Sequence, residues 1–124
     1  MSIEDLKNRF KKFAIEVAML IQKLPKNTIN NAYCNQLIRC SSSSAANYRA
    51  ACRAKSPADF INKLKIVEEE SDESVYWLEL IKTFNELEDP KFDLLLKESC
   101  ELEKIFTASA ITAKNNRNKQ LTQS

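Results

Sequence analysis

Apolar residues recur along the first part of the chain with the spacing of one face of a helix. This face consists of seven residues: Ile3, Leu6, Phe10, Phe13, Val17, Leu20 and Leu24. Alternating steps of three and four residues are typical of helices that pack at shallow angles in bundles. Ser2 can cap such a helix with Asp5 three residues later, and Pro25 disfavours its continuation. The pattern predicts a helix over residues 2–24.

The second apolar pattern contains a run of small polar residues. Its stripe consists of Leu37, Ser41, Ser44, Tyr48, Ala51 and Lys55. The serines at 41–44 could form a flexible linker, as Ser-rich segments often do. We favour a helix over residues 30–55, because helical spacing continues on both sides of the run and the alanines that follow it are strong helix formers. Small side chains here would let a neighbouring backbone approach closely.

Two proline-containing segments predict the starts of two further helices. Ser56–Asp59 combines a capping serine, a proline at the first helical position and an acid at the third,. The helix that follows should run to about Leu87, and its apolar face is wide enough to suggest contacts beyond its bundle neighbours. Asp89-Pro90 begins a fourth apolar pattern, which continues to about residue 113.

Four helices joined by three short connections predict an all-α fold, the antiparallel up-down-up-down four-helix bundle. We expect the bundle to occupy residues 1–113. Residues 114–124 are polar and mildly basic, and we expect them to form a disordered tail.

The composition excludes several chemistries. The 124 residues include no Gly and no His. Glycine-rich phosphate loops and nucleophile elbows need Gly, and His is the usual base near neutral pH and a common metal ligand. We therefore expect no enzymatic activity, no cofactor and no metal. The four cysteines include no C-x-x-C pair, which favours small apolar residues in a reducing compartment over a zinc site.

The charge and hydropathy of the chain favour a cytoplasmic protein. No apolar run approaches the roughly 20 residues of a membrane span, and early charges interrupt any signal-peptide layout. The formal net charge of +2 permits a nucleic-acid partner without requiring one,.

Charged residues on the two central helices have two interpretations. Arginines precede the second connection, and a cluster of carboxylates follows it. In the structural interpretation they form a polar network within or between subunits, made of Asn47, Arg49, Arg53, Glu70 and Glu73,. In the functional interpretation a basic surface binds the phosphates of RNA or DNA. The candidates for that surface are Arg39, Arg49, Arg53, Lys55, Lys7 and Lys11.

Two smaller groups of residues also carry alternatives. Tyr48, Tyr76 and Trp77 could stack on bases, but at helical spacing we favour core or subunit-interface positions. Glu70 lies on an apolar stripe, where a paired acid is the expected role. A metal-binding or general-acid role for Glu70 with Glu73 is disfavoured by the absence of His,.

The middle of the chain resembles the bacterial "four helix bundle protein" family, known from proteins encoded within intervening sequences of large-subunit ribosomal RNA genes. The matching segments are Gln36–Arg39, the small-residue run, Ala46–Ala54, Asp59–Ile61, Lys63-Leu64, Ile66–Glu70, Asp72–Ser74 and Trp77–Leu80. A weaker echo follows in Glu101-Leu102, Ile105-Phe106, Ala108-Ser109 and Thr112–Lys114. The small-residue run often contains Gly in the family, whereas here it is Ser41–Ser44 and Ala45.

The resemblance implies a compact bundle that often assembles as a ring-like homopentamer, with no established enzymatic activity. A related branch, the accessory proteins of diversity-generating retroelements, forms pentameric barrels whose basic surfaces engage nucleic acid. Our leading expectation is an oligomeric, non-enzymatic protein that binds RNA or DNA. The alternative is a structural module that recruits an unidentified protein partner.

Overall fold

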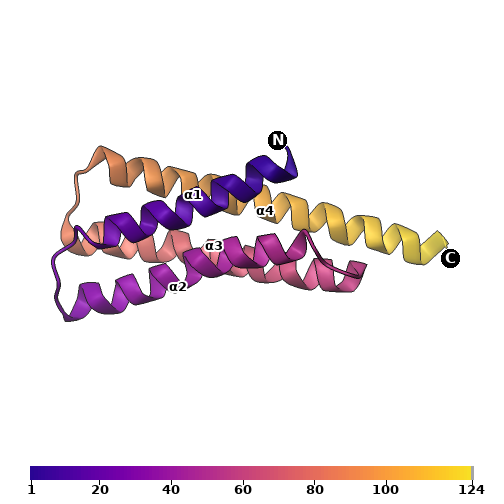
Figure 1. Cartoon of the computed structure of the whole chain (residues 1–124), viewed down its shortest axis with the longest axis horizontal. Coiled ribbons are helices and arrows are strands. Elements are labelled where there is room, and N and C mark those ends of the chain that lie inside the picture. Colours follow the sequence, from indigo (N-terminus) through magenta and orange to yellow (C-terminus); the bar gives the residue numbers. More distant parts are fainter. Residues whose placement is uncertain (124) are drawn as a thin grey trace.

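The computed structural model describes the backbone of residues 1–123 and the side chains of residues 1–108, 115, 116, 118 and 119. It contains four helices: α1 (Ile3–Ile21), α2 (Thr28–Ala51), α3 (Pro57–Asn85) and α4 (Pro90–Gln123). Consecutive helices run antiparallel, and α1 and α3 each lie between α2 and α4 (Figure 1). This arrangement confirms the predicted up-down-up-down bundle.

The beginnings of the helices follow the capping chemistry of the sequence. Ser2 and Asp5 form the predicted capping box, and Ser56 caps α3 with Pro57 at its first position. The second helix begins at Thr28, earlier than predicted, because the Asn27 side chain accepts a hydrogen bond from the Asn30 N–H at 2.8 Å. The spacing of apolar residues along the sequence does not reveal an N-cap side chain such as that of Asn27.

The ends of the first three helices fall short of the predicted positions. They lie at Ile21, Ala51 and Asn85, because the chain must leave each helix early enough to turn into the next cap. After α3, Glu86 adopts a left-handed conformation with φ 51°. This position normally favours Gly or Asn, and the chain contains no Gly.

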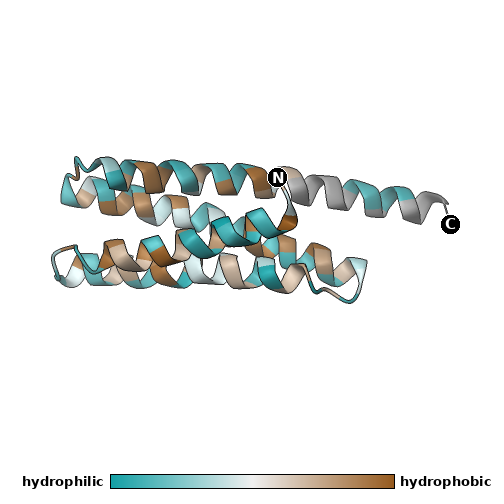
Figure 2. Ribbon diagram, turned by 45° about the horizontal axis from the view of Figure 1, so that its top comes forward, coloured by the Kyte–Doolittle hydropathy of each residue, from teal (hydrophilic) through white to brown (hydrophobic). Residues whose placement is uncertain are grey.

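The core is built from the predicted apolar stripes (Figure 2). Phe10, Tyr48 and Phe106, from three different helices, pack together in it, with Tyr48 and Phe106 in an edge-to-face contact at 5.0 Å between ring centroids. Tyr48 is only 7% exposed. Of the two positions that we favour for it from the sequence, the core and a subunit interface, Tyr48 therefore occupies the core.

Small residues lie between α2 and α3, which form the most extensive helix contact of the bundle. The serine run is helical throughout, and Ser41 and Ser44 are buried, as are Ser71 and Ser74 on α3. The prediction of a helix rather than a linker is confirmed. Among the described side chains, two buried hydroxyls have no hydrogen-bond partner, those of Ser71 and Ser99.

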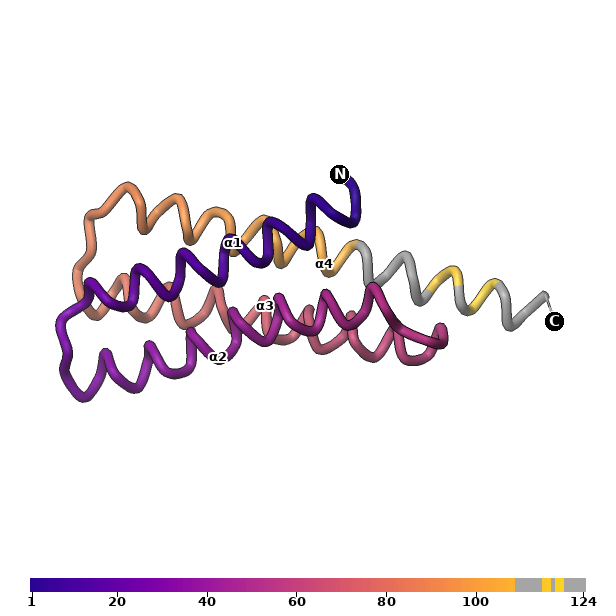
Figure 3. Tube along the Cα trace, in the orientation of Figure 1, coloured from indigo at the N-terminus to yellow at the C-terminus, as the bar shows by residue number. Residues whose placement is uncertain are grey.

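The last part of α4 extends past the other helices (Figures 1 and 3). The helix continues to Gln123, beyond residue 113, where we expected the bundle to end. The predicted boundary and most of the predicted tail lie outside the residues with described side chains. All four cysteines are free. Across the described part of the chain, no helix has the length and hydropathy that a membrane crossing requires.

Candidate nucleic-acid interface

Arg39 on α2 is the arginine that meets the carboxylates of α3. Its Nη1 donates to both oxygens of Glu70 at 3.2 and 3.1 Å, and its Nη2 donates to Glu73 Oε2 at 2.7 Å. The two acids lie one helical turn apart, so one guanidinium reaches both. Hydrogen bonding to Glu73 and the charge of Glu70 raise the pKa of Arg39. Within the subunit, the network at Glu70 and Glu73 therefore contains Arg39 and not the predicted Arg49 or Arg53.

The geometry of a helical hairpin explains this correction. Asn30 pairs with Asn85, and Arg39 pairs with Glu70, so residue numbers fall on one helix as they rise on the other. Arg49 is ten residues after Arg39 in α2, so it lies opposite α3 residues about ten positions before Glu70. These residues, near 60, are far from the carboxylates in the middle of α3. Arg49 and Arg53 are exposed, and neither forms an ion pair with any described residue.

Asn47 does not connect helices either. Its amide donates to the Ser43 carbonyl at 2.8 Å, within the same helix. The amide that fixes the register is Asn30, which is buried and exchanges two hydrogen bonds of 2.8 Å with Asn85. It also donates to the Pro25 carbonyl at 2.9 Å. Sequence reasoning missed Asn30, although its position seven residues before Leu37 places it on the apolar face of α2.

Arg39 lies beside a cluster of possible metal ligands. A ligand atom of Cys40 lies within 4.8 Å of ligand atoms of Glu70 and Glu73. Burial raises the pKa of the Cys40 thiol, which favours its protonated form over the thiolate that binds metals. The Arg39 guanidinium already compensates both carboxylates. A cation would have to displace it, so these residues fit an ion pair better than a metal site.

Most of the basic residues of α1 form ion pairs with carboxylates of α1 or α4. Arg9 binds Glu98 through two nitrogens and Glu101 at 3.0 Å, which ties α1 to α4. Lys7 lies 3.5 Å from Glu4 in its own helix. Of the two candidates on this helix, only Lys11 is exposed and without an ion pair among the described residues.

Three free cations lie where α2 turns into α3. We call Arg49, Arg53 and Lys55 the basic turn. Arg49 is in the last turn of α2, and the other two lie in the connection. All three are exposed, and none forms an ion pair within the described part of the chain. The sequence from 49 to 65 adds Lys63 and Lys65 and contains a single acid, Asp59.

Four aromatic residues of α2 and α3, two exposed and two half-buried, form a separate surface. Trp77 contacts Tyr33 at 5.8 Å and Tyr76 at 5.1 Å between ring centroids, and Tyr33 also contacts Phe84 at 6.1 Å. We call these four residues the aromatic cluster. Tyr76 is 54% exposed and Phe84 is 47% exposed. The cluster lies toward the opposite end of the α2–α3 hairpin from the basic turn, which favours a protein contact over base stacking beside bound phosphates.

The fold and these surfaces define a four-helix bundle in which exposed cations and aromatic rings are the conspicuous groups of the described residues. Comparison with protein families places the chain more narrowly. The model of the 23S rRNA-intervening sequence protein family matches residues 5–108. The chain belongs to this family.

A solved structure supports the same relationship. It is the 1.70 Å crystal structure of a protein with unknown function from the S23 ribosomal protein family of Bacteroides thetaiotaomicron. The two chains share 30% sequence identity with a TM-score of 0.78, over 89% of this chain and 98% of the other. Among curated proteins, none matches the chain.

Proposed function

We propose that this protein is a non-enzymatic accessory protein that binds RNA or DNA through the basic turn. The supporting observation is that Arg49, Arg53 and Lys55 are exposed without ion pairs to described residues, whereas Arg39 is held by two carboxylates. Free surface cations bind phosphates by releasing counterions, which gives affinity with little dependence on base sequence. The family name refers to 23S rRNA, so structured RNA is the first ligand to test.

The sequence of the last helix adds to this proposal. After Glu103 it contains no acidic side chain and four basic ones: Lys104, Lys114, Arg117 and Lys119. The α4 C-terminus and the turn between α2 and α3 lie toward the same end of the molecule (Figure 1). A nucleic acid bound at the basic turn could therefore extend along this segment.

The test is the salt dependence of RNA binding by the double variant Arg49→Ala/Arg53→Ala. Each lost phosphate contact should reduce the slope of log K against log salt by roughly 0.7–0.9. The double variant should therefore lose about 1.5 from the slope and bind more weakly at low salt. The matched control is Lys26→Ala/Lys97→Ala, which removes the same charge from exposed positions elsewhere.

Two results would contradict this proposal. One is wild-type binding that does not weaken as salt rises, because counterion release requires that dependence. The other is an equal loss of affinity and slope in both double variants, which would indicate only the effect of net charge.

We also propose that the protein assembles into a homo-oligomer, a pentamer by resemblance, through the aromatic cluster. Aromatic residues are enriched in protein interfaces, and exposed rings in mutual contact are otherwise costly to leave in water. The variant Tyr76→Ala/Phe84→Ala should reduce the mass measured by light scattering. Phe60→Ala, an exposed aromatic residue near the start of the same helix, should leave the mass unchanged.

The aromatic cluster also supports the second candidate function, a protein-interaction module without a nucleic-acid ligand. In that case structured RNA should not shift the mass of the assembly. If Arg49 and Arg53 also join a polar network between subunits, as in the structural interpretation, charge reversal at either should disrupt assembly. An intact oligomer that has lost RNA binding would favour the accessory-protein function instead.

A further inference from the structure

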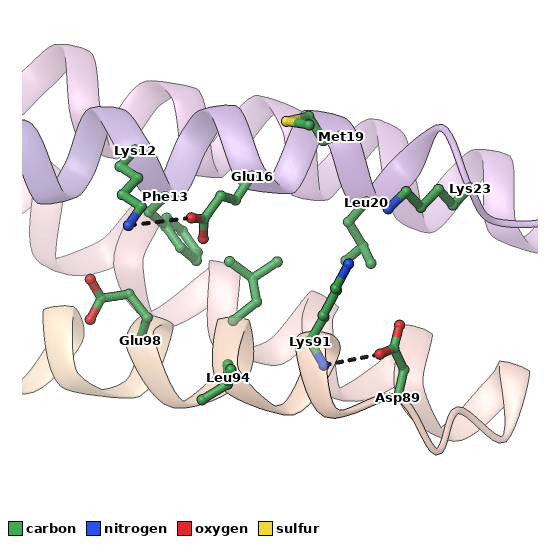
Figure 4. A pocket seen from close by; sticks show the side chains of 11 residues that line it. Lys12, Phe13, Glu16, Met19, Leu20, Lys23, Asp89, Lys91, Leu94 and Glu98 are labelled. Atoms are coloured by element: carbon green, nitrogen blue, oxygen red, sulfur yellow. Dashed lines mark hydrogen bonds and ion pairs between the residues drawn. The ribbon is translucent and has the colours of Figure 1, made fainter.

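A groove with a volume of about 490 Å³ lies between α1 and α4 (Figure 4). These two helices form the least extensive contact between neighbours in the bundle. Buried Phe13 and Leu95 and half-buried Leu20 line the groove. Met19 and Leu94 complete its apolar surface, although they are 57% and 68% exposed. This volume lies within the usual range for small-molecule sites.

The acidic residues along the groove already have hydrogen-bond or ion-pair partners within the chain. Glu98 is held by Arg9, and Glu16 lies 3.8 Å from Lys12. Asp89 accepts a hydrogen bond of 2.9 Å from a backbone N–H in the first turn of α4, where the helix dipole favours a negative charge. Glu98 and Glu16 therefore have local partners of opposite charge. The Asp89 carboxylate is held by the start of α4 and, within the described part of the chain, forms no ion pair with the remaining cations of the groove.

Two lysines of the groove remain free. Lys23 and Lys91 are exposed, and neither forms a side-chain ion pair with any residue of the described chain. Figure 4 shows the Lys91 side chain rising from α4 toward Leu20, while Lys23 extends along α1 toward the same residue. An apolar surface thus ends beside two ammonium groups that form no ion pair with described residues.

We propose that this groove binds a small anionic amphiphile. Its apolar body would lie against Phe13, Leu20 and Leu95, and its carboxylate or phosphate head group would lie between Lys23 and Lys91. The apolar part contributes affinity through burial, and the two ammonium groups distinguish an anionic head group from a neutral one. This inference does not depend on nucleic-acid binding, because the basic turn lies toward the other end of the bundle (Figure 1).

The test is calorimetric titration of the full chain with decanoate, and with decanol as its neutral counterpart, below the concentration at which decanoate forms micelles. We expect one decanoate to bind per chain and decanol to bind more weakly. Lys23→Ala/Lys91→Ala should weaken decanoate binding by a factor of about five, as expected for two partly exposed ion pairs. Met19→Glu/Leu94→Glu should abolish it, because these changes place negative charge on the apolar surface.

Lys26→Ala/Lys97→Ala serves again as the charge-matched control, because neither residue lines the groove. Circular dichroism on each variant verifies that it is folded. Equal affinity for decanoate and decanol would overturn the proposal, as would equal weakening by both lysine pairs or no binding by the wild type. A smaller assembly in Met19→Glu/Leu94→Glu, without decanoate binding by the wild type, would instead assign the groove to a contact between copies of the chain.

Discussion

Replacing Ser71 with alanine should stabilise the protein. Ser71 lies on α3 at 3% exposure, and its hydroxyl has no hydrogen-bond partner among the described residues. Folding removes this hydroxyl from water without replacing its hydrogen bonds, which costs roughly 1–3 kcal/mol. Alanine keeps the Cβ and removes the unsatisfied oxygen.

The expected gain has two parts. Relief of the unsatisfied hydroxyl should contribute roughly 1–2 kcal/mol, and the higher helix propensity of alanine about 0.5 kcal/mol. A gain of about 2 kcal/mol should raise the melting temperature of a chain of this size by about 8 °C, given an unfolding entropy of roughly 2 cal/mol/K per residue.

Two serines of α2 provide the controls. Ser42 is exposed, so Ser42→Ala reports helix propensity alone. Ser44 is buried, but its hydroxyl donates to the Ser41 carbonyl at 2.9 Å, so Ser44→Ala also removes a hydrogen bond. Urea unfolding followed by circular dichroism should rank Ser71→Ala above both. All variants should be compared at one protein concentration, because oligomerisation shifts apparent stability. A gain for Ser71→Ala no larger than that for Ser42→Ala would refute the reasoning.

Three further expectations concern the turn after α3, the buried amides and the buried Tyr48. Glu86→Gly should stabilise the fold by about 1 kcal/mol in urea unfolding, because the φ of 51° carries a steric cost for any residue with a Cβ,. Asn30→Ala should destabilise it by roughly 2–3 kcal/mol by leaving the Asn85 amide short of a partner,; a double-mutant cycle with Asn85→Ala should show strong coupling. Burial raises the pKa of Tyr48 from 10.0 to about 12, so its contribution to stability is full below pH 10 and is lost as the pH rises toward 12. Tyr48→Phe should not show this loss of stability at high pH. In the variant, tyrosinate absorbance should show one tyrosine fewer that ionises near pH 12.

The α2–α3 hairpin contains polar contacts of two kinds. Arg39 and Glu73 are about half exposed and Glu70 is 18% exposed, so these partly solvated ion pairs should contribute only about 1 kcal/mol to folding,. The Asn30–Asn85 pair is buried, and sliding one helix along the other would leave both amides unsatisfied. The register of the hairpin therefore depends more on the amides than on the charges.

The ion pairs of Arg39 also exclude this residue from the proposed nucleic-acid surface. A phosphate at Arg39 would compete with Glu70 and Glu73, whereas a phosphate at Arg49 or Arg53 displaces no carboxylate in the described chain. This difference explains why the proposed interface excludes one of the arginines that the sequence made a candidate.

The sequence determined the elements of this fold. The spacing of its apolar residues specified four helices, Ser2 and Ser56 specified two helix starts, and the alanines after the serine run indicated an unbroken α2. These features are local, because a cap or a helical face depends on residues within one or two turns.

Only the tertiary structure decided which polar groups meet. The choice of Arg39 over Arg49 as the partner of Glu70, the buried position of Tyr48 and the pairing of Asn30 with Asn85 all depend on the axial stagger and rotation of packed helices. Apolar periodicity leaves that stagger undefined, because a stripe of similar side chains can pack at neighbouring registers with similar burial. The short turns and the buried amides select one register. That register also leaves the basic turn, and Lys23 and Lys91 of the α1–α4 groove, without ion pairs to described residues.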